Sequence, residues 1–248
     1  MKTIKFLLKF KTTRRLIDSI IKNYFLARNI NIFFLNHRNL KLEINMEDSF
    51  DRVFLFKGYW EDKQINYLID YAKKNKVEVF IDVGSNSGLY SLIFSKNISL
   101  IKVLSYEPIF ETYEKQHRNI SLNNLEKNIK VYNYGLSDTN KKVFFKTKTS
   151  YNYDQSSTYK VSPDGDTEGD VKIFDEYNNI INKKLIIKID IEGHELEALK
   201  GMLKTFKKNS ILLQVEIFPE NYTKVNNFLI TKGFNFKMKI DSDFFYEN

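Results

Sequence analysis

Apolar residues recur along most of this chain with two alternating periods. Most of the short apolar runs, which are typical of buried strands, are followed by a segment whose apolar positions have helical spacing. The segments that we expect to be strands are 79–82, 102–106, 131–134, 143–148, 185–189, 211–215 and 234–240, the last opening a final strand pair. The expected helices are 65–72, 89–95, 113–122, 195–204 and 225–232. Repeated strand–helix units predict an α/β fold of three layers, with a mainly parallel sheet between helices on both faces.

The segments before residue 62 follow a different pattern. Residues 40–57 predict short strands, because 51–55 alternate between polar and apolar side chains, and 58–61 predict a turn. Between residues 16 and 25, apolar side chains recur at helical spacing among lysines and arginines, which predicts a basic amphipathic helix. We therefore divide the chain into a basic helical extension, 1–38, and one α/β domain, 39–248.

Three kinds of partner would suit this basic extension. Its helix could pack on the α/β domain or on a second copy of the chain, as in a homo-oligomer. Residues 1–35 could instead dock on an anionic membrane surface, because a basic amphipathic helix binds such surfaces. Contact with RNA is the third alternative.

Composition and charge narrow the class of protein. The chain has 248 residues, of which 42% are hydrophobic, and it contains no cysteine. This excludes disulfides, thiolate metal sites and cysteine nucleophiles, and therefore cytosine methylation through a cysteine adduct. Residues 1–42 contain ten basic residues and one acid, Asp18, whereas the remainder has 29 basic and 30 acidic residues. The nearly neutral domain argues against nucleic acid as a substrate, which would need positive charge around the site.

The sequence predicts neither a membrane-spanning segment nor a signal peptide. No apolar run approaches the roughly 18–20 residues that span a bilayer. Basic residues interrupt the early apolar stretches, which argues against a signal peptide; they are Lys9, Lys11, Arg14 and Arg15. We expect a cytoplasmic protein, with peripheral contact at the inner face of the membrane as the alternative.

Residues 79–88, with the sequence VFIDVGSNSG, join a buried strand to a turn with two glycines. Glycine permits positive φ and close approach of the backbone to a ligand, and the amides of the next helix would face the same place. The spacing differs from the dinucleotide pattern G-x-G-x-x-G and suits S-adenosylmethionine (SAM), whose ammonium group needs carboxylate and carbonyl partners. Alternatively, Asp82 caps the next helix and the glycines only turn the chain. The residues expected at the cofactor are Asp82, Gly84, Ser85, Asn86 and Gly88.

Four expected strands end in a carboxylate, and together these acids predict a ligand site. They are Asp82, Glu107, Asp190 and Glu216. Ligands of open α/β sheets bind beyond the carboxyl ends of the strands, and an acid at the position of Glu107 would bond both ribose hydroxyls of the cofactor. Ser137 and Asp138 follow the third strand, where an adenine ring would lie. Either could bond it, and a plain turn is the alternative.

Residues 188–195, with the sequence KIDIEGHE, gather three acids and a histidine at a strand-to-helix junction. A hydroxyl that attacks the SAM methyl group must lose its proton to a base. We expect this base to be His194, because a helix N-terminus disfavours the imidazolium form. The alternative is that His194 only starts the helix.

The acids of this region have further expected roles. Asp190 and Glu192 would orient the acceptor, Asp190 would also lie at the cofactor, and Glu216 would contact the substrate. We expect no metal ion. The alternative is a Mg²⁺ ion held by Asp190, Glu192 and Glu216, because this hard cation prefers carboxylates and water.

These motifs, taken in order, resemble one known family. The segments IDVGSNSGLYS, YEP, YNYGLSD, IIKIDIEGHELEALKGM and LLQVEIFPE are similar to those of FkbM-type SAM-dependent methyltransferases, over about residues 40–240. The resemblance implies a Rossmann-like class I methyltransferase fold with a mainly parallel seven-stranded sheet, and O-methylation of sugar hydroxyls or polyketide-type products. Its cofactor positions match Asp82, Gly84, Asn86, Gly88 and Glu107, and its second motif matches Asp190, Glu192, Gly193 and Glu195.

We therefore expect a SAM-dependent O-methyltransferase that acts on a sugar hydroxyl of a bacterial surface polysaccharide or of its nucleotide-activated precursor. Residues 151–169 predict a polar loop whose Ser156 and Ser157 would contact the acceptor, with a solvated loop as the alternative. An RNA or other nucleic-acid methyltransferase is the alternative enzyme. Against this alternative, the present chain lacks the adjacent prolines of the motif that adenine-methylating enzymes usually contain. A non-catalytic protein that keeps the fold within a membrane-associated glycan assembly is a further alternative.

Overall fold

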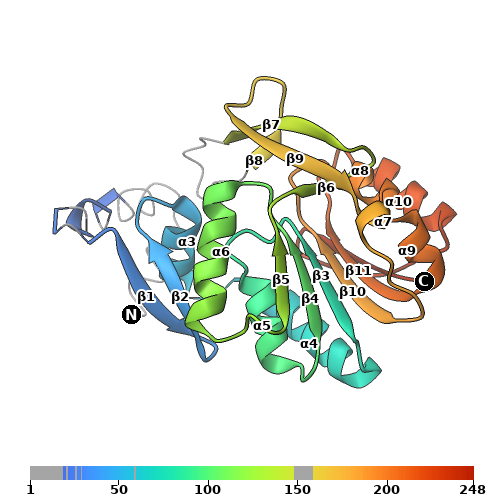
Figure 1. Cartoon of the computed structure of the whole chain (residues 1–248), viewed down its shortest axis with the longest axis horizontal. Coiled ribbons are helices and arrows are strands. Elements are labelled where there is room, and N and C mark those ends of the chain that lie inside the picture. The colour runs from blue at the N-terminus through green and yellow to red at the C-terminus, as the bar shows by residue number, and fades with distance from the viewer. Residues whose placement is uncertain (1–18, 21, 26, 29, 59, 148–158) are drawn as a thin grey trace. The chain divides into compact units, whose positions relative to one another are not determined.

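The computed structural model of the chain describes residues 19–248, apart from 21, 26, 29, 59 and 148–158. The chain divides into two compact units (Figure 1). The first comprises Met1–Asp62 and Thr147–Thr158, and the second comprises Lys63–Lys146 and Tyr159–Asn248. In the described part of the chain, we find no helix with the length and apolar character needed to cross a bilayer.

The larger unit is built on a seven-stranded sheet with the strand order β12-β13-β11-β10-β3-β4-β5. The pairs from β11 to β5 are parallel, and β13 pairs antiparallel with both β11 and β12. The strands are β3 (Val79–Val83), β4 (Lys102–Tyr106), β5 (Ile129–Tyr132), β10 (Lys184–Ile189), β11 (Ser210–Glu216), β12 (Asn235–Ile240) and β13 (Asp243–Glu247). This arrangement confirms the Rossmann-like α/β fold with a mainly parallel sheet.

Helices cover both sides of this sheet (Figure 1). On one side lie α4 (Asp62–Asn75), α5 (Leu89–Asn97) and α6 (Phe110–Leu122). On the other lie α8 (Glu195–Lys200), α9 (Leu203–Lys208) and α10 (Tyr222–Thr231). Every residue of β3 is buried, as expected for a parallel strand with both faces covered.

Alternation along β3 sends its side chains to the two layers. Phe80 stacks on Phe94 of α5, with ring centroids 3.8 Å apart. Ile81 and Val83 belong to the core formed with Leu199 and the other apolar residues of α8–α10. Asp82 therefore lies on the α5 side of the strand, which decides its contacts below.

A second sheet of four strands, in the order β6-β9-β7-β8, was not predicted. Its strands are β6 (Gly135–Ser137), β7 (Lys141–Thr147), β8 (Tyr159–Val161) and β9 (Thr167–Ile173), and a four-residue helix, α7 (Phe174–Tyr177), follows β9. Only the strand expected at 143–148 anticipated part of it. The expected polar loop is wrong where it includes 159–161 and 167–169, because those residues pair as strands.

Two other element predictions shift. The strand expected at 131–134 is β5, which begins and ends two residues earlier, since Gly135–Ser137 pairs with β9 instead. The helix expected at 195–204 is two helices, because the helical conformation is interrupted at Gly201, between α8 and α9. A Cβ at Gly201 would lie 2.2 Å from the Ser137 carbonyl oxygen, so the backbone approaches β6 there.

The first unit contains a hairpin of β1 (Ile32–His37) and β2 (Leu40–Asn45), followed by α3 (Ser49–Lys57). The strand predicted for 51–55 is wrong, because these residues are helical. Phe50, Val53 and Phe54 are buried at helical spacing, and the Asp48 carboxylate accepts a hydrogen bond of 2.8 Å from the Phe50 amide. Of the predicted basic helix, residues 19–20 and 22–25 are helical, and most of the extension lies outside the described residues. The boundary between 38 and 39 stays a prediction.

Candidate functional site

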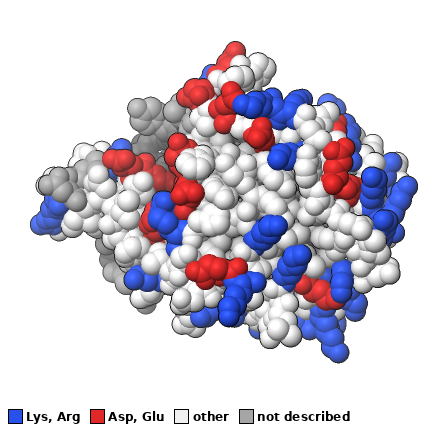
Figure 2. All heavy atoms as spheres, in the orientation of Figure 1, with Lys and Arg blue, Asp and Glu red and all other residues white. Residues whose placement is uncertain are grey.

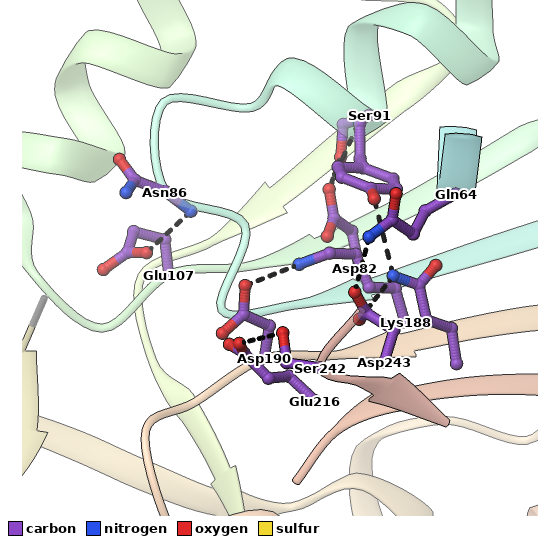
Figure 3. Close-up of polar contacts among 12 residues, drawn as sticks. Gln64, Asp82, Asn86, Ser91, Glu107, Lys188, Asp190, Glu216, Ser242 and Asp243 are labelled. Carbon is purple, nitrogen blue, oxygen red and sulfur yellow. Dashed lines mark hydrogen bonds and ion pairs between the residues drawn. The ribbon is translucent and has the colours of Figure 1, made fainter. Parts of the chain in front are cut away.

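The four strand-end acids lie at the carboxyl edge of the sheet (Figure 3). Asp82 is the penultimate residue of β3, Glu107 and Asp190 directly follow β4 and β10, and Glu216 ends β11. These four strands are consecutive neighbours in the sheet. The fold therefore brings the acids to one edge, where α/β proteins bind ligands.

The turn between β3 and α5 is held tightly against the strand ends. The amides of Gly84 and Ser85 donate to the Tyr106 carbonyl, at 3.0 and 3.1 Å. Gly84 has φ of +76°, and a Cβ there would lie 2.0 Å from the Asp190 carbonyl oxygen. Only glycine fits this position, because both the conformation and the space exclude a side chain.

Asp82 is buried and turned toward α5. The amide and the hydroxyl of Ser91 donate to its carboxylate, at 3.2 and 2.7 Å (Figure 3). Burial raises the pKa of this carboxyl above its ordinary value. The geometry matches the alternative in which Asp82 caps the helix, and its contact with a cofactor stays a prediction.

Glu107, directly after β4, is hydrogen-bonded to the glycine turn that follows β3. It is 6% exposed, and its carboxylate accepts hydrogen bonds of 2.9 Å from the amides of Asn86 and Ile109 (Figure 3). Burial raises its pKa to about 7. A carboxylate fixed by two amides beside the glycine turn is well placed to accept hydrogen bonds from a ribose.

Gln116 supports this turn and was missed in the sequence. The Ser85 hydroxyl donates to its side-chain oxygen at 2.9 Å, and its amide group donates to Ser105 at 2.6 Å. A Cβ at Gly88 would also lie 2.6 Å from the Gln116 side chain. Ser85 is therefore held by the protein itself. In the sequence, Gln116 could have been noticed only as a polar residue on the buried face of an amphipathic helix.

Asp190, Glu192 and Glu216 form a carboxyl cluster whose members each place an oxygen within 4.8 Å of the others. The Ser242 hydroxyl donates to Glu216 at 2.7 Å (Figure 3). The charge of Asp190 and burial raise the pKa of Glu216 to about 9. All three side chains are partly exposed, so this cluster is open to a ligand.

Lys188 contacts the carboxyl cluster through Asp190. This lysine was not predicted from the sequence as a site residue. It is 4% exposed, its ammonium group lies 3.1 Å from Asp190, and it is 4.8 Å from the centroid of the Tyr90 ring. This cation supplies positive charge to Asp190. The expected absence of a metal ion and the Mg²⁺ alternative at this cluster both stay predictions. In the sequence, Lys188 could have been noticed as a lysine within an otherwise apolar strand.

A buried polar network continues behind Lys188. Gln214 and Gln64 donate to the Asp243 carboxylate, at 2.7 and 3.1 Å (Figure 3). Asp243 is on the antiparallel strand β13, far from the other motifs in the sequence. The residues next to it in the chain gave no indication that it would lie near the site.

His194 lies at the start of α8 and faces Ser137. The Ser137 hydroxyl and the His194 Nε2 are 3.0 Å apart, and Ser137 is fully buried. Burial lowers the pKa of His194, which keeps the imidazole neutral near pH 7. Ser137 therefore contacts a predicted catalytic residue. Its predicted contact with an adenine ring stays a prediction, as does the role of His194 as the base.

Glu195 follows His194 and is also buried. It accepts a hydrogen bond of 2.7 Å from the Gly193 amide, and burial raises its pKa to about 7. Ser156 and Ser157, the expected acceptor contacts, lie outside the described residues.

Parts of this chain are similar to known methyltransferases. The family model described as the methyltransferase FkbM domain matches residues 82–238. The hexuronic acid methyltransferase AglP of Haloferax volcanii is 28% identical over 170 residues, covering 66% of this chain and 67% of AglP. The methyltransferase sdnD of Sordaria araneosa is 25% identical over 180 residues, covering 60% of this chain and 68% of sdnD. A solved structure, titled human methyltransferase 10 domain containing protein, is 13% identical with a TM-score of 0.49, covering 84% of this chain and 86% of that one.

Proposed function

Because this chain belongs to the FkbM methyltransferase family, whose methyl donor is SAM, we propose that it transfers the methyl group to a hydroxyl oxygen of a sugar. The sugar would belong to a surface polysaccharide or to its nucleotide-activated precursor. The similar protein AglP is named for methylation of a hexuronic acid, which supports a sugar acceptor.

One observation carries this proposal: the open carboxyl cluster of Asp190, Glu192 and Glu216 adjoins the glycine turn. Carboxyl groups accept and donate the hydrogen bonds that the several hydroxyls of a sugar require. Because the Gly84 backbone contacts that of Asp190, an acceptor held by the cluster would lie beside a cofactor held by the turn and Glu107.

The reaction would be a direct displacement at the methyl carbon. When bound by the turn and Glu107, SAM would supply the methyl group: the new carbon–oxygen bond would replace the carbon–sulfur bond, and the sulfur would keep the electron pair. The acceptor proton passes to a base, for which His194 is the first candidate and Asp190 the second. Much of the rate would come from holding the oxygen in line with the methyl group.

A transfer assay with purified protein tests the proposal. Protein and SAM carrying a labelled methyl group are incubated with oligogalacturonate, nucleotide-activated glucuronic and galacturonic acids, neutral hexoses and RNA. We expect label on a sugar as a methyl ether, which alkali does not release, and none on RNA. Transfer to RNA alone, or to no sugar in the panel despite SAM binding, would overturn the sugar assignment.

A matched pair of variants tests the cofactor site within the same assay. Glu107→Ala should weaken SAM binding by about tenfold or more, because hydrogen bonds to charged groups contribute about 1.5–3 kcal/mol. Glu111→Ala removes an exposed acid from nearby α6 and should leave the affinity unchanged. Equal SAM affinities in the two variants would remove Glu107 from the cofactor site.

A further inference from the structure

Five side chains form a row on the larger unit, which we call the tyrosine–lysine patch. Tyr177 is 55% exposed, Lys130 is exposed, and the other members are partly exposed. The members come from β5, the segment after it, β9 and α7, and are Lys130, Tyr132, Tyr134, Lys172 and Tyr177.

The tyrosine rings of the patch are continuous with one another and with the core. The ring centroids of Tyr132 and Tyr134 are 5.4 Å apart, and those of Tyr134 and Tyr177 are 6.2 Å apart. The buried Tyr106 anchors the row by stacking on Tyr132 at 4.9 Å with nearly parallel planes. The patch is therefore a fixed aromatic surface rather than a set of independent side chains.

Two ammonium groups lie over these rings. Lys130 Nζ is 4.9 Å from the centroid of Tyr132, and Lys172 Nζ is 4.5 Å from Tyr134 and 5.2 Å from Tyr177. Within the described part of the chain, neither ammonium group forms an ion pair with a carboxylate. Contact with a ring leaves the ammonium groups charged, so both remain available to an anionic ligand.

The fold leaves this surface uncovered. β5 is an end strand of the seven-stranded sheet (Figure 1), and α7, whose Tyr177 contacts Tyr134, has only four residues. Figure 2 shows a largely uncharged surface over β5, with isolated basic side chains in it. An exposed aromatic surface of this kind commonly marks a binding site.

The patch also borders the candidate site. The amide of Glu107 donates to the Tyr132 carbonyl at 3.1 Å, and the Asn133 side chain donates to the Glu107 carbonyl at 3.0 Å. A ligand on the patch would therefore lie close to the residue expected to hold the ribose of SAM.

We propose that the tyrosine–lysine patch binds an acidic sugar of the acceptor glycan, outside the reacting position; this rests on the proposed function. The C–H face of a pyranose packs on the electron-rich face of an aromatic ring, and its carboxylate pairs with an ammonium group. A sugar acid carries both groups on one ring. Its carboxylate would draw the Lys172 ammonium group away from the rings of Tyr134 and Tyr177, and the pyranose would take the place that this group leaves. Burial and the neighbouring tyrosines raise the pKa of Tyr134 to about 12, so its phenol stays a hydrogen-bond donor.

Calorimetry with an oligogalacturonate probe, and with a neutral galacto-oligosaccharide of the same length, tests this proposal on the full chain. Lys172→Gln and Tyr177→Ala should each weaken oligogalacturonate binding by about fivefold to tenfold, as expected for the loss of one interface contact. The neutral oligosaccharide should bind more weakly than the acidic one to the unsubstituted protein.

Two control variants share the chemistry of the patch but lie elsewhere. Lys239→Gln removes an ammonium group that lies 4.5 Å from the Phe244 ring, and Tyr222→Ala removes a tyrosine that is 36% exposed. Both should bind oligogalacturonate like the unsubstituted protein. All four variants should keep its SAM affinity and its rate with a monosaccharide acceptor.

Three results would overturn the proposal: no binding of oligogalacturonate, equal loss in patch and control variants, or tighter binding of single-stranded RNA that the patch variants abolish. Failure of the proposed function is distinct, because it would appear as absent methyl transfer to every sugar while oligogalacturonate still binds the patch.

Discussion

Gly84 shows how closely the candidate site depends on single residues. Its backbone has positive φ, and it lies against the Asp190 carbonyl, so one atom added there would disturb both the cofactor turn and the carboxyl cluster. Elsewhere in the same unit, Gly233 has φ of +87° but no atom near an added Cβ. The two positions separate the cost of conformation from the cost of contact.

We expect Gly84→Ala to destabilise the protein by about 2–4 kcal/mol, because overpacking adds about 1–3 kcal/mol to the conformational cost. Gly233→Ala should cost only about 1 kcal/mol. Urea unfolding of both variants measures the difference, and SAM binding should be lost only in the first. Equal losses of stability would show that the turn relaxes away from Asp190.

His194 carries the prediction about the base. His194→Ala should lower kcat by about a hundredfold or more, the usual contribution of a positioned base, and leave SAM affinity nearly unchanged. Because burial lowers its pKa, the imidazole should stay neutral at neutral pH, and the fall in kcat caused by its protonation should begin at a lower pH than for an ordinary histidine. His117→Ala, on the exposed side of α6, is the control. Full activity of His194→Ala would assign the proton to a carboxylate or to solvent.

The sequence identified the residues whose position follows from local order, and missed those whose partners are distant. Asp82, Glu107, Asp190 and Glu216 were found because each ends a recognisable strand. Asp243 was missed, because its partner Gln64 is 179 positions away in the chain. A side chain that acquires its role only through tertiary contacts leaves no periodic signal.

At the scale of elements, the mainly parallel sheet between two helical layers followed from repeated strand–helix units, whereas the second sheet did not. Its β6 has only three residues, too few for any period to be read. Helix α3 was mistaken for a strand because a short segment with alternating apolar residues fits both periods. The break between α8 and α9 depends on a contact with β6 that the sequence does not display.

That break has a consequence for the site. Gly201 approaches the carbonyl of Ser137, the residue that contacts His194. Gly201→Ala should push α8 away from β6, lower stability by about 1–3 kcal/mol and reduce kcat together with it. Lys200→Ala, at an exposed neighbour, should do neither. Thermal unfolding and the transfer assay measure both effects, and an unchanged kcat in a destabilised Gly201→Ala variant would contradict the link to His194.

At the scale of the whole molecule, buried carboxyls couple folding to pH. Burial raises the pKa of Glu107 and Glu195 to about 7, and the charge of Asp190 together with burial raises that of Glu216 to about 9. An acid with a raised pKa binds its proton more tightly in the folded chain. Its contribution to stability is therefore present at low pH and is lost as pH rises through the folded pKa.

We expect the free energy of unfolding to fall between pH 7 and 9 by about 1–2 kcal/mol, since a proton held only by the folded state contributes at most about 1.4 kcal/mol per pH unit. Glu216 is the main group that titrates in this window, so Glu216→Gln should flatten the profile. Urea unfolding at several pH values measures it. A steady rise in stability from pH 7 to 9 would contradict the assignment.

The partners predicted for residues 1–38 stay predictions, because most of that segment lies outside the described residues. The methyl transfer assigned to the larger unit does not depend on which of them is correct.

The central claim is that this enzyme adds a methyl group to a sugar hydroxyl. Mass spectrometry of surface glycans from cells with and without the gene tests it most directly. The account predicts a glycan fragment lighter by one CH₂ group in cells without the gene, restored by the unsubstituted gene but not by one encoding Glu107→Ala. Identical glycans in both cells, with the missing methyl group found instead on RNA, would contradict it.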